Sequence, residues 1–265
     1  FHTLKFYCNT TVISCHFKSR QAAFNRYVTV AYNCTAEIIA AACTEEAVTG
    51  IRTVAALFME ILCVHVLCIA CYLTDSLCQG RATGTRGNVE AAFWIQRKFE
   101  KAGLLKFGDS YGKRIYLDKG LVGHNVAGMI PGSSKRPSDR YIIIGAHYDH
   151  LGILDGKMYP GADANASGVV ALTGLADMIS TMQKDGRIYS CNMIFVAFDA
   201  KEHSLAGSEA FWRLIEDGSL KDPVSGGKIT PDKIDFMVNI DQIGTTLSPL
   251  HEDRKDFIIM DVILG

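Results

Sequence analysis

Two uninterrupted apolar runs constrain the fold of this chain more than any other feature of its sequence. The first run is YIIIGA over residues 141–146, and the second is MIFVAF over residues 193–198. Strands that are apolar at every position are buried on both faces, which is typical of a parallel sheet covered by helices on either side. A helix predicted over 167–182 lies between the two runs, so the segment has the strand–helix–strand order of an α/β fold.

The other predicted elements extend this alternation. We expect a helix from Asn88, as its N-cap, to Gly103, where a glycine favours the stop. We expect further strands over 114–118, 124–130, 236–240 and 257–264. A further helix is expected from residue 211 to residue 215. The predicted fold class is therefore α/β, a three-layer α/β/α sandwich around a mostly parallel, mixed central sheet.

The composition divides the chain into unlike parts. Eight of the nine cysteines lie within residues 1–78, whereas all eight methionines and all six prolines lie at Met59 or later. We therefore predict a fragment or non-native upstream segment over 1–58, a hydrophobic segment over 54–80, and an α/β domain over 81–265. The alternative for the cysteines is a set of disulfides in a small secreted domain; their spacing is not that of a zinc finger.

An apolar stretch over residues 54–73 is broken only by Glu60 and His65. Its length matches the ~20 residues of a membrane helix. A buried helix of a soluble fold is the alternative to a membrane helix. Arg52 ahead of it and small or polar residues behind it favour an export signal or anchor. We therefore expect an extracytoplasmic domain, whether secreted, periplasmic or membrane-anchored, with membrane contact only through this segment.

The overall charge gives no indication of a charged partner. The formal net charge is -1, and no strongly basic stretch is present. We therefore expect neither nucleic acid nor an anionic membrane surface as a partner.

Residue types that bind metals follow the predicted strands where each strand ends. Singly, each has a structural explanation: Asp163 or Asn165 can cap the next helix, and Glu202 can be a solvated charge. Together they predict a metal site, because ligands gather at the carboxyl ends of strands in such folds. The set consists of His147, Asp149, His150, Asp163, Asp199, Lys201, Glu202, His203 and Asp241.

Four sequence blocks carry a resemblance to a known family. GAHYDHLG (145–152), GADANASG (161–168), FDAKEHSLAGS (198–208) and VNIDQIG (238–244) resemble the signature blocks of metallopeptidase family 28, the co-catalytic zinc aminopeptidases of clan MH. The resemblance implies a zinc-dependent catalytic domain over 81–265. It also implies hydrolysis of peptide bonds by metal-activated water, with N-terminal residues removed from a peptide or protein substrate.

The resemblance also implies roles for individual residues. Asp163 would bridge two zinc ions, and Asp149 would orient the imidazole of His147. Gly161 and Gly168 would let the backbone approach the metals closely. The implied metal ligands are His147, Asp163, Glu202 and Asp241.

One catalytic position departs from the family pattern. Lys201 stands where the family has the glutamate that acts as general base. A neutral lysine would accept the proton and a charged one would stabilise the oxyanion, while Asp199 is an alternative proton acceptor. Loss of a general base costs ~10²–10⁴-fold in rate, so we expect reduced activity. The alternatives are a metal-binding pseudoenzyme or peptide-binding module, and a glutaminyl-cyclase-like acyltransferase, which the Asp199 position fits.

A second departure concerns the histidine of the second zinc. In the family it comes from a loop well beyond the position of Asp241. Neither His203 nor His251 fits that role by spacing. We therefore expect an incomplete second site and a catalytic domain that is truncated at its C-terminal end.

Overall fold

The computed structural model describes residues 2–8, 11–17, 70–132, 139–187, 189–244 and 261–264. Within the predicted upstream segment, β1 (His2–Cys8) and β2 (Thr11–Phe17) pair antiparallel. Most of the predicted export signal, residues 54–69, lies outside the described residues. No helix in the described ranges combines the length and hydrophobicity needed to cross a membrane.

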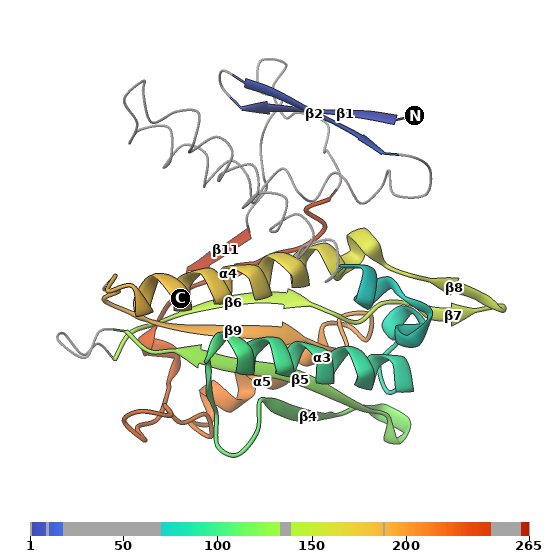
Figure 1. Ribbon diagram of the computed structural model, residues 1–265. Coiled ribbons are helices and arrows are strands. Elements are labelled where there is room, and N and C mark those ends of the chain that lie inside the picture. The colour runs from blue at the N-terminus through green and yellow to red at the C-terminus, as the bar shows by residue number, and fades with distance from the viewer. Residues whose placement is uncertain are drawn as a thin grey trace, which may run out of the picture.

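A seven-stranded mixed sheet forms the centre of the fold (Figure 1). Its order is β11–β10–β6–β9–β5–β3, and β4 also pairs with β5. The strands are β3 (Leu105–Lys106), β4 (Gly112–Tyr116), β5 (Val122–Ile130), β6 (Tyr141–His147), β9 (Asn192–Phe198), β10 (Ile234–Asn239) and β11 (Asp261–Leu264).

The predicted mixed sheet is confirmed, but its parallel part is smaller than we expected. Among the described strands, only β6 has parallel neighbours on both sides, β10 and β9. The other described strand pairs of this sheet are antiparallel, namely β10–β11, β5–β9, β4–β5 and β3–β5. Strands β4 and β5 are joined by a short connection that contains only the 3-10 turn η3 (Asp118–Gly120), and such a connection produces an antiparallel pair.

Helices cover both faces of the sheet, which confirms the three layers. On one face, α3 (Arg86–Ala102) and α4 (Ser167–Lys184) lie side by side, and α5 (Ala206–Glu216) lies on the other (Figure 1). Phe99 of α3 and Leu172 of α4 belong to one buried cluster with the sheet, and Phe211 of α5 belongs to a second. The central strands are therefore buried on both faces, as their apolar runs predicted.

The start of α3 differs from the prediction. Thr85 is the N-cap, and its hydroxyl accepts a hydrogen bond from the backbone N–H of Asn88 at 3.3 Å. Asn88 itself lies inside the first turn, where its buried amide donates to Asp199 instead. The predicted stop is confirmed: Gly103 adopts the left-handed conformation, with φ +83°.

The folded domain extends upstream of the boundary expected at residue 81. The helical segment 70–74 and the 3-10 helix η2 (Ser76–Arg81) pack against the rest of the domain. Leu73 and Cys78 are completely buried and belong to the same apolar cluster as α3. Apolar side chains of these residues thus form part of the core.

A small hairpin also extends from the domain between β6 and the turn that precedes α4 (Figure 1). It consists of β7 (Gly152–Leu154) and β8 (Lys157–Tyr159), and both strands contact η2. The turn that follows, η4 (Ala162–Ala166), is a short π-helical segment. The hairpin therefore joins the two parts of the chain that carry the first predicted metal ligands.

Candidate functional site

The predicted site residues gather at one edge of the sheet because three neighbouring strands run in the same direction. His147 is the last residue of β6, and it lies in register with Phe198, the last residue of β9. Beyond the end of β10, the backbone N–H of Ile240 donates to Gly145 of β6 at 2.8 Å. This pairing brings Asp241 next to the end of β6.

The central contact of the site joins His147 and Asp241. Nε2 of His147 lies 3.2 Å from Oδ1 of Asp241. On the other side of the ring, Nδ1 lies 3.1 Å from the backbone carbonyl of Asp149 and 3.6 Å from its Oδ1. Two acceptors at Nδ1 favour a proton there, which leaves Nε2 directed at Asp241.

Electrostatics favour the charged forms of this pair. Burial lowers the pKa of His147, but the hydrogen bonds and negative charges of Asp149 and Asp241 outweigh it and raise that pKa to about 9. Burial raises the pKa of Asp241, but the hydrogen bond and charge of His147, with the charge of Lys201, bring it below its ordinary value. In the metal-free protein the pair is therefore ionised at neutral pH, and a metal must displace the imidazole proton.

Asp149 connects this pair to the loop after β9. It is completely buried, and its Oδ2 accepts a hydrogen bond from the backbone N–H of Glu202 at 3.0 Å. Its Oδ1 makes no hydrogen bond within the described structure and lies 3.6 Å from Nδ1 of His147. Asp149 has the position expected for orienting His147, although its backbone carbonyl is nearer to the ring than its carboxylate.

Lys201 and Glu202 form an ion pair with each other. Nζ of Lys201 lies 3.3 Å from Oε1 of Glu202, and both side chains are about one-third exposed, at 31% and 30%. The preceding residue, Ala200, has a φ of +56°, an unfavourable left-handed conformation for a residue with a Cβ. The lysine at the predicted base position therefore neutralises the carboxylate that was predicted to bind the second metal.

The predicted bridging residue, Asp163, lies in η4. Its Oδ1 accepts a hydrogen bond from the backbone N–H of Gly244 at 3.0 Å. Gly161 precedes it with a φ of +54°, and a Cβ there would lie 2.5 Å from Cδ2 of His150. A Cβ at Gly168 would likewise lie 2.5 Å from the carbonyl oxygen of Ile240. Both glycines thus permit close contact with neighbouring segments of the chain. The predicted approach to metals stays a prediction.

Asn165 has a role that sequence analysis missed. Its amide Nδ2 donates to Ile240 at 2.8 Å and to the backbone carbonyl of His147 at 3.3 Å. Its Oδ1 accepts from the backbone N–H groups of Gly168 at 3.0 Å and Gln242 at 3.1 Å. The sequence suggested a helix cap, which the Gly168 bond provides. The other bonds tie the ends of β6 and β10 to η4, and a sequence pattern gives no signal for them.

Asp199 lies apart from the His147–Asp241 pair. It is completely buried, and its carboxylate accepts hydrogen bonds from four donors: Thr83 Oγ1 at 2.9 Å, Asn88 Nδ2 at 2.9 Å, His124 N at 2.8 Å and Ala200 N at 2.8 Å. Burial is the main cause that raises its pKa. The proton-accepting role considered for Asp199 needs an accessible oxygen, and this arrangement does not provide one.

The predicted ligands fit zinc by their chemistry but are only partly assembled. One imidazole and three carboxylates form a donor set that zinc accepts. Within the described parts of the chain, however, no three His, Cys, Asp or Glu side chains lie close enough together to hold a metal ion. His147 and Asp241 are in contact, whereas Asp163 bonds the Gly244 amide and Glu202 pairs with lysine. The assembled part of the site is therefore the His147–Asp241 pair.

A comparison with known families supports the resemblance. The family model described as "Peptidase family M28" matches residues 125–251. This segment belongs to peptidase family M28. The M28 segment contains all four predicted metal ligands, together with Asp149, Asn165 and Lys201.

Solved structures with the same type of fold include peptidases and cyclases. The Legionella pneumophila LapA aminopeptidase is 22% identical, with 67% of this chain and 45% of that chain covered and a TM-score of 0.46. LapB of the same organism is 18% identical (91% and 66% covered, TM-score 0.49), and a Bacteroides thetaiotaomicron glutaminyl cyclase is 21% identical (67% and 60%, TM-score 0.46). The chain thus covers less than half the length of LapA. No curated protein matches the sequence.

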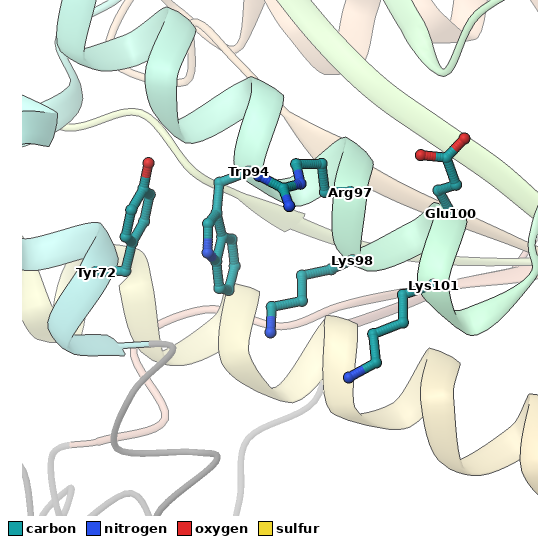
Figure 2. A pocket seen from close by; sticks show the side chains of 6 residues that line it. All are labelled: Tyr72, Trp94, Arg97, Lys98, Glu100 and Lys101. Carbon is teal, nitrogen blue, oxygen red and sulfur yellow. The ribbon is translucent and has the colours of Figure 1, made fainter.

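One surface pocket of the described residues lies outside the M28 segment. It has a volume of about 550 Å³ and is lined by Tyr72, Trp94, Arg97, Lys98, Glu100 and Lys101 (Figure 2). The rings of Tyr72 and Trp94 are stacked there with their centroids 5.4 Å apart. Because α3 and the segment before it line the pocket, it contains none of the predicted site residues.

Proposed function

We propose that the M28 segment is the metal centre of a zinc-dependent aminopeptidase that removes N-terminal residues from peptides or proteins. The observation that carries the proposal is the 3.2 Å contact between Nε2 of His147 and Oδ1 of Asp241. The two residues come from the carboxyl ends of adjacent parallel strands, and both lie within the matched family segment. A buried imidazole beside a carboxylate at such a position suits a catalytic zinc ion.

Each predicted ligand then has a part in holding metal. His147 and Asp241 would bind one zinc ion, Glu202 a second, and Asp163 both. Bound zinc would polarise the scissile carbonyl and acidify a water molecule. Asp149 would keep the proton of His147 on Nδ1, so that Nε2 is available to the metal.

Lys201 would set the rate. Its ammonium group lies 3.3 Å from Glu202 and its charge lowers the pKa of Asp241, so it is a cation beside the proposed ligands. A cation there stabilises a developing oxyanion but accepts no proton. Asp199 does not replace the missing base, because it is buried and already held by four donors. We therefore expect slow hydrolysis.

The Lys201–Glu202 ion pair also favours a second candidate function, a metal-binding pseudoenzyme or peptide-binding module without turnover. The substitution Lys201→Glu separates the two. A gain in hydrolysis on the order of 10²–10⁴-fold indicates an enzyme that lacks its base. If wild type is active and the variant loses that activity, the lysine takes part in the reaction. If neither wild type nor Lys201→Glu hydrolyses a substrate, the pseudoenzyme is supported.

The first experiment measures zinc content by atomic spectroscopy together with hydrolysis of a panel of aminoacyl-nitroanilides. A glutaminyl peptide in the panel reports cyclisation, which distinguishes a cyclase from a peptidase. His147→Ala should lose zinc, whereas the control Tyr141→Phe, at the opposite end of β6, should keep it. A wild-type protein that binds no zinc, or a His147→Ala variant that binds as much as wild type, contradicts the proposal.

An extracytoplasmic location is part of the same proposal. It is supported by the apolar stretch over 54–73, with Arg52 before it. Expression of the chain with a C-terminal reporter enzyme that is active only outside the cytoplasm tests it. The reporter should be active, and it should become inactive when charged residues interrupt the stretch.

A further inference from the structure

Arg81 is a completely buried arginine whose side chain bonds to main-chain carbonyls. It is the last residue of η2. The guanidinium donates to four carbonyl oxygens: Tyr148 O at 2.6 Å from Nε, Pro160 O at 2.8 Å and Leu73 O from Nη1, and Gly161 O at 2.8 Å from Nη2. A planar group with five donors can hold several acceptors in fixed directions, which a lysine ammonium cannot do.

The carbonyls that Arg81 binds stand next to the proposed metal ligands. Tyr148 follows His147 directly, and Gly161 lies two residues before Asp163. The hairpin β7–β8 separates these two segments in sequence, so the chain alone does not fix the distance between them. A single guanidinium bonded to both segments does fix it.

The backbone of Arg81 makes a second connection. Its own carbonyl oxygen accepts hydrogen bonds from the backbone N–H of His150 and from Nδ2 of Asn88, both at 3.2 Å. Arg81 has a φ of +56°, and the two residues before it are also left-handed. That conformation is unfavourable for a residue with a Cβ, and it lets the Arg81 carbonyl bond to His150 and Asn88.

The charge of Arg81 also suits this place. Burial lowers the pKa of Arg81 to about 10, so the guanidinium remains charged at neutral pH. The negative charge of Asp149 acts in the opposite direction and favours the charged form. Burying a charge is costly unless carbonyl dipoles and an opposite charge compensate for it, and here both are present.

We propose that Arg81 is a positioning residue of the metal centre, whose guanidinium sets the distance between the end of β6 and the turn that carries Asp163. The proposal rests on the proposed metal-binding function. It adds a residue from outside the matched family segment, which begins at residue 125. Arg81 would touch neither metal nor substrate and would act through backbone carbonyls.

The test compares Arg81→Lys and Arg81→Met with the control Tyr141→Phe in the full-length protein. The control removes a buried hydrogen bond of 2.6 Å from the Tyr141 hydroxyl to Asp222, away from the site. Zinc affinity is measured by competition with a chelating dye, and kcat and KM with the best substrate of the panel. Amide hydrogen exchange is followed without metal at His150 and Ala166, which bond to the backbone carbonyls of Arg81 and Gly161.

We expect both Arg81 variants to lose about 10–100-fold in zinc affinity, the size of effect seen when residues behind metal ligands are replaced. Their kcat should fall while KM changes little, and exchange should become faster at His150 and Ala166 than in the control at equal global stability. Tyr141→Phe should lower the melting temperature without changing zinc affinity or exchange at the site. If Arg81→Met does not fold, Arg81→Lys, which keeps the charge, provides the test.

The outcomes separate this proposal from the proposed function. Zinc affinity and site exchange in Arg81→Lys equal to those of the control would overturn the role of Arg81 and leave the metal centre intact. A wild-type protein without zinc would overturn the metal centre. In that case amide hydrogen exchange without metal still tests the role of Arg81. If the Arg81 variants protect the amides of His150 and Ala166 as well as wild type does, Arg81 does not position the end of β6 and the turn that carries Asp163.

Discussion

The substitution Asn165→Asp tests whether one amide holds the candidate site together. It keeps the shape of the side chain and the oxygen that accepts from the backbone N–H groups of Gly168 and Gln242. It replaces Nδ2, which donates to the backbone carbonyls of Ile240 and His147, by a second oxygen. At neutral pH a buried carboxylate oxygen then faces two carbonyl oxygens.

The size of the effect follows from these contacts. Two hydrogen bonds are lost, at about 1 kcal/mol each, and the unpaired buried oxygens add a penalty of similar size. We therefore expect a loss of about 3 kcal/mol in the free energy of unfolding at pH 7. For a domain of this size such a loss lowers the melting temperature by roughly 10 °C.

The pH dependence distinguishes this explanation from a simple loss of packing. The new carboxyl group has its folded-state pKa raised above the ordinary value of about 3.9, because its surroundings favour the neutral form that can donate. The folded protein then binds more protons than the unfolded one, so the loss of stability is smallest at acid pH and grows as the pH rises through the folded-state pKa. Asn165→Ala has no titrating group there, and its loss should not vary with pH relative to wild type.

Urea unfolding followed by circular dichroism at several pH values between 4 and 8 provides the measurement. The difference between Asn165→Asp and wild type should shrink toward pH 4, while the difference for Asn165→Ala stays constant. A variant as stable as wild type at pH 7 would refute the hydrogen-bond assignment. A loss that is independent of pH would show that the amide does not face the two carbonyls.

Three further predictions concern charges at the site. In the metal-free protein, the pKa of His147 is about 9 when folded against an ordinary 6.5, so its contribution to stability is complete below pH 6.5 and is lost as the pH rises through 9. It amounts to roughly 3 kcal/mol, and His147→Gln should flatten that part of the urea-unfolding profile. Asp163→Ala should abolish stoichiometric zinc binding at an almost unchanged melting temperature. Asp199→Asn should lower stability and keep zinc binding. Its NH2 group would replace Oδ2 and face the His124 N–H donor, which costs about 2–3 kcal/mol while zinc per folded molecule is retained.

Elements with a strong local pattern could be predicted from the sequence, and those decided by tertiary contacts could not. The strands β6 and β9 lie within one residue of the predicted runs, because uninterrupted apolar residues fit only a strand buried on both faces. The start of α3 was placed at Asn88 because asparagine and threonine are both good caps. Burial of Asn88 against Asp199 makes Thr85 the cap, and no local pattern reveals that contact.

The same distinction applies to the candidate site. The four predicted ligands could be proposed from the sequence because each follows a recognisable strand or glycine turn. Arg81 and Asn165 could not, since their partners are mostly backbone carbonyl and amide groups, which every residue carries. A side chain that binds backbone has no complementary side chain in the sequence to reveal it. The predicted domain boundary fell at Arg81 because the apolar stretch before it was interpreted as an export signal, although Leu73 belongs to the core.

Under the proposed function, these backbone-directed contacts would separate metal binding from turnover. Arg81, Asn165 and Asp199 hold the strand ends by bonds that need no metal, so the segments that carry the ligands are organised before zinc arrives. Lys201 belongs to none of these contacts; it is partly exposed and pairs with Glu202. Its replacement should therefore change proton transfer and the charge on one ligand, but not the assembly of the site. The proposed function therefore predicts that zinc affinity depends on the buried polar framework, whereas the rate of hydrolysis depends on the residue at position 201.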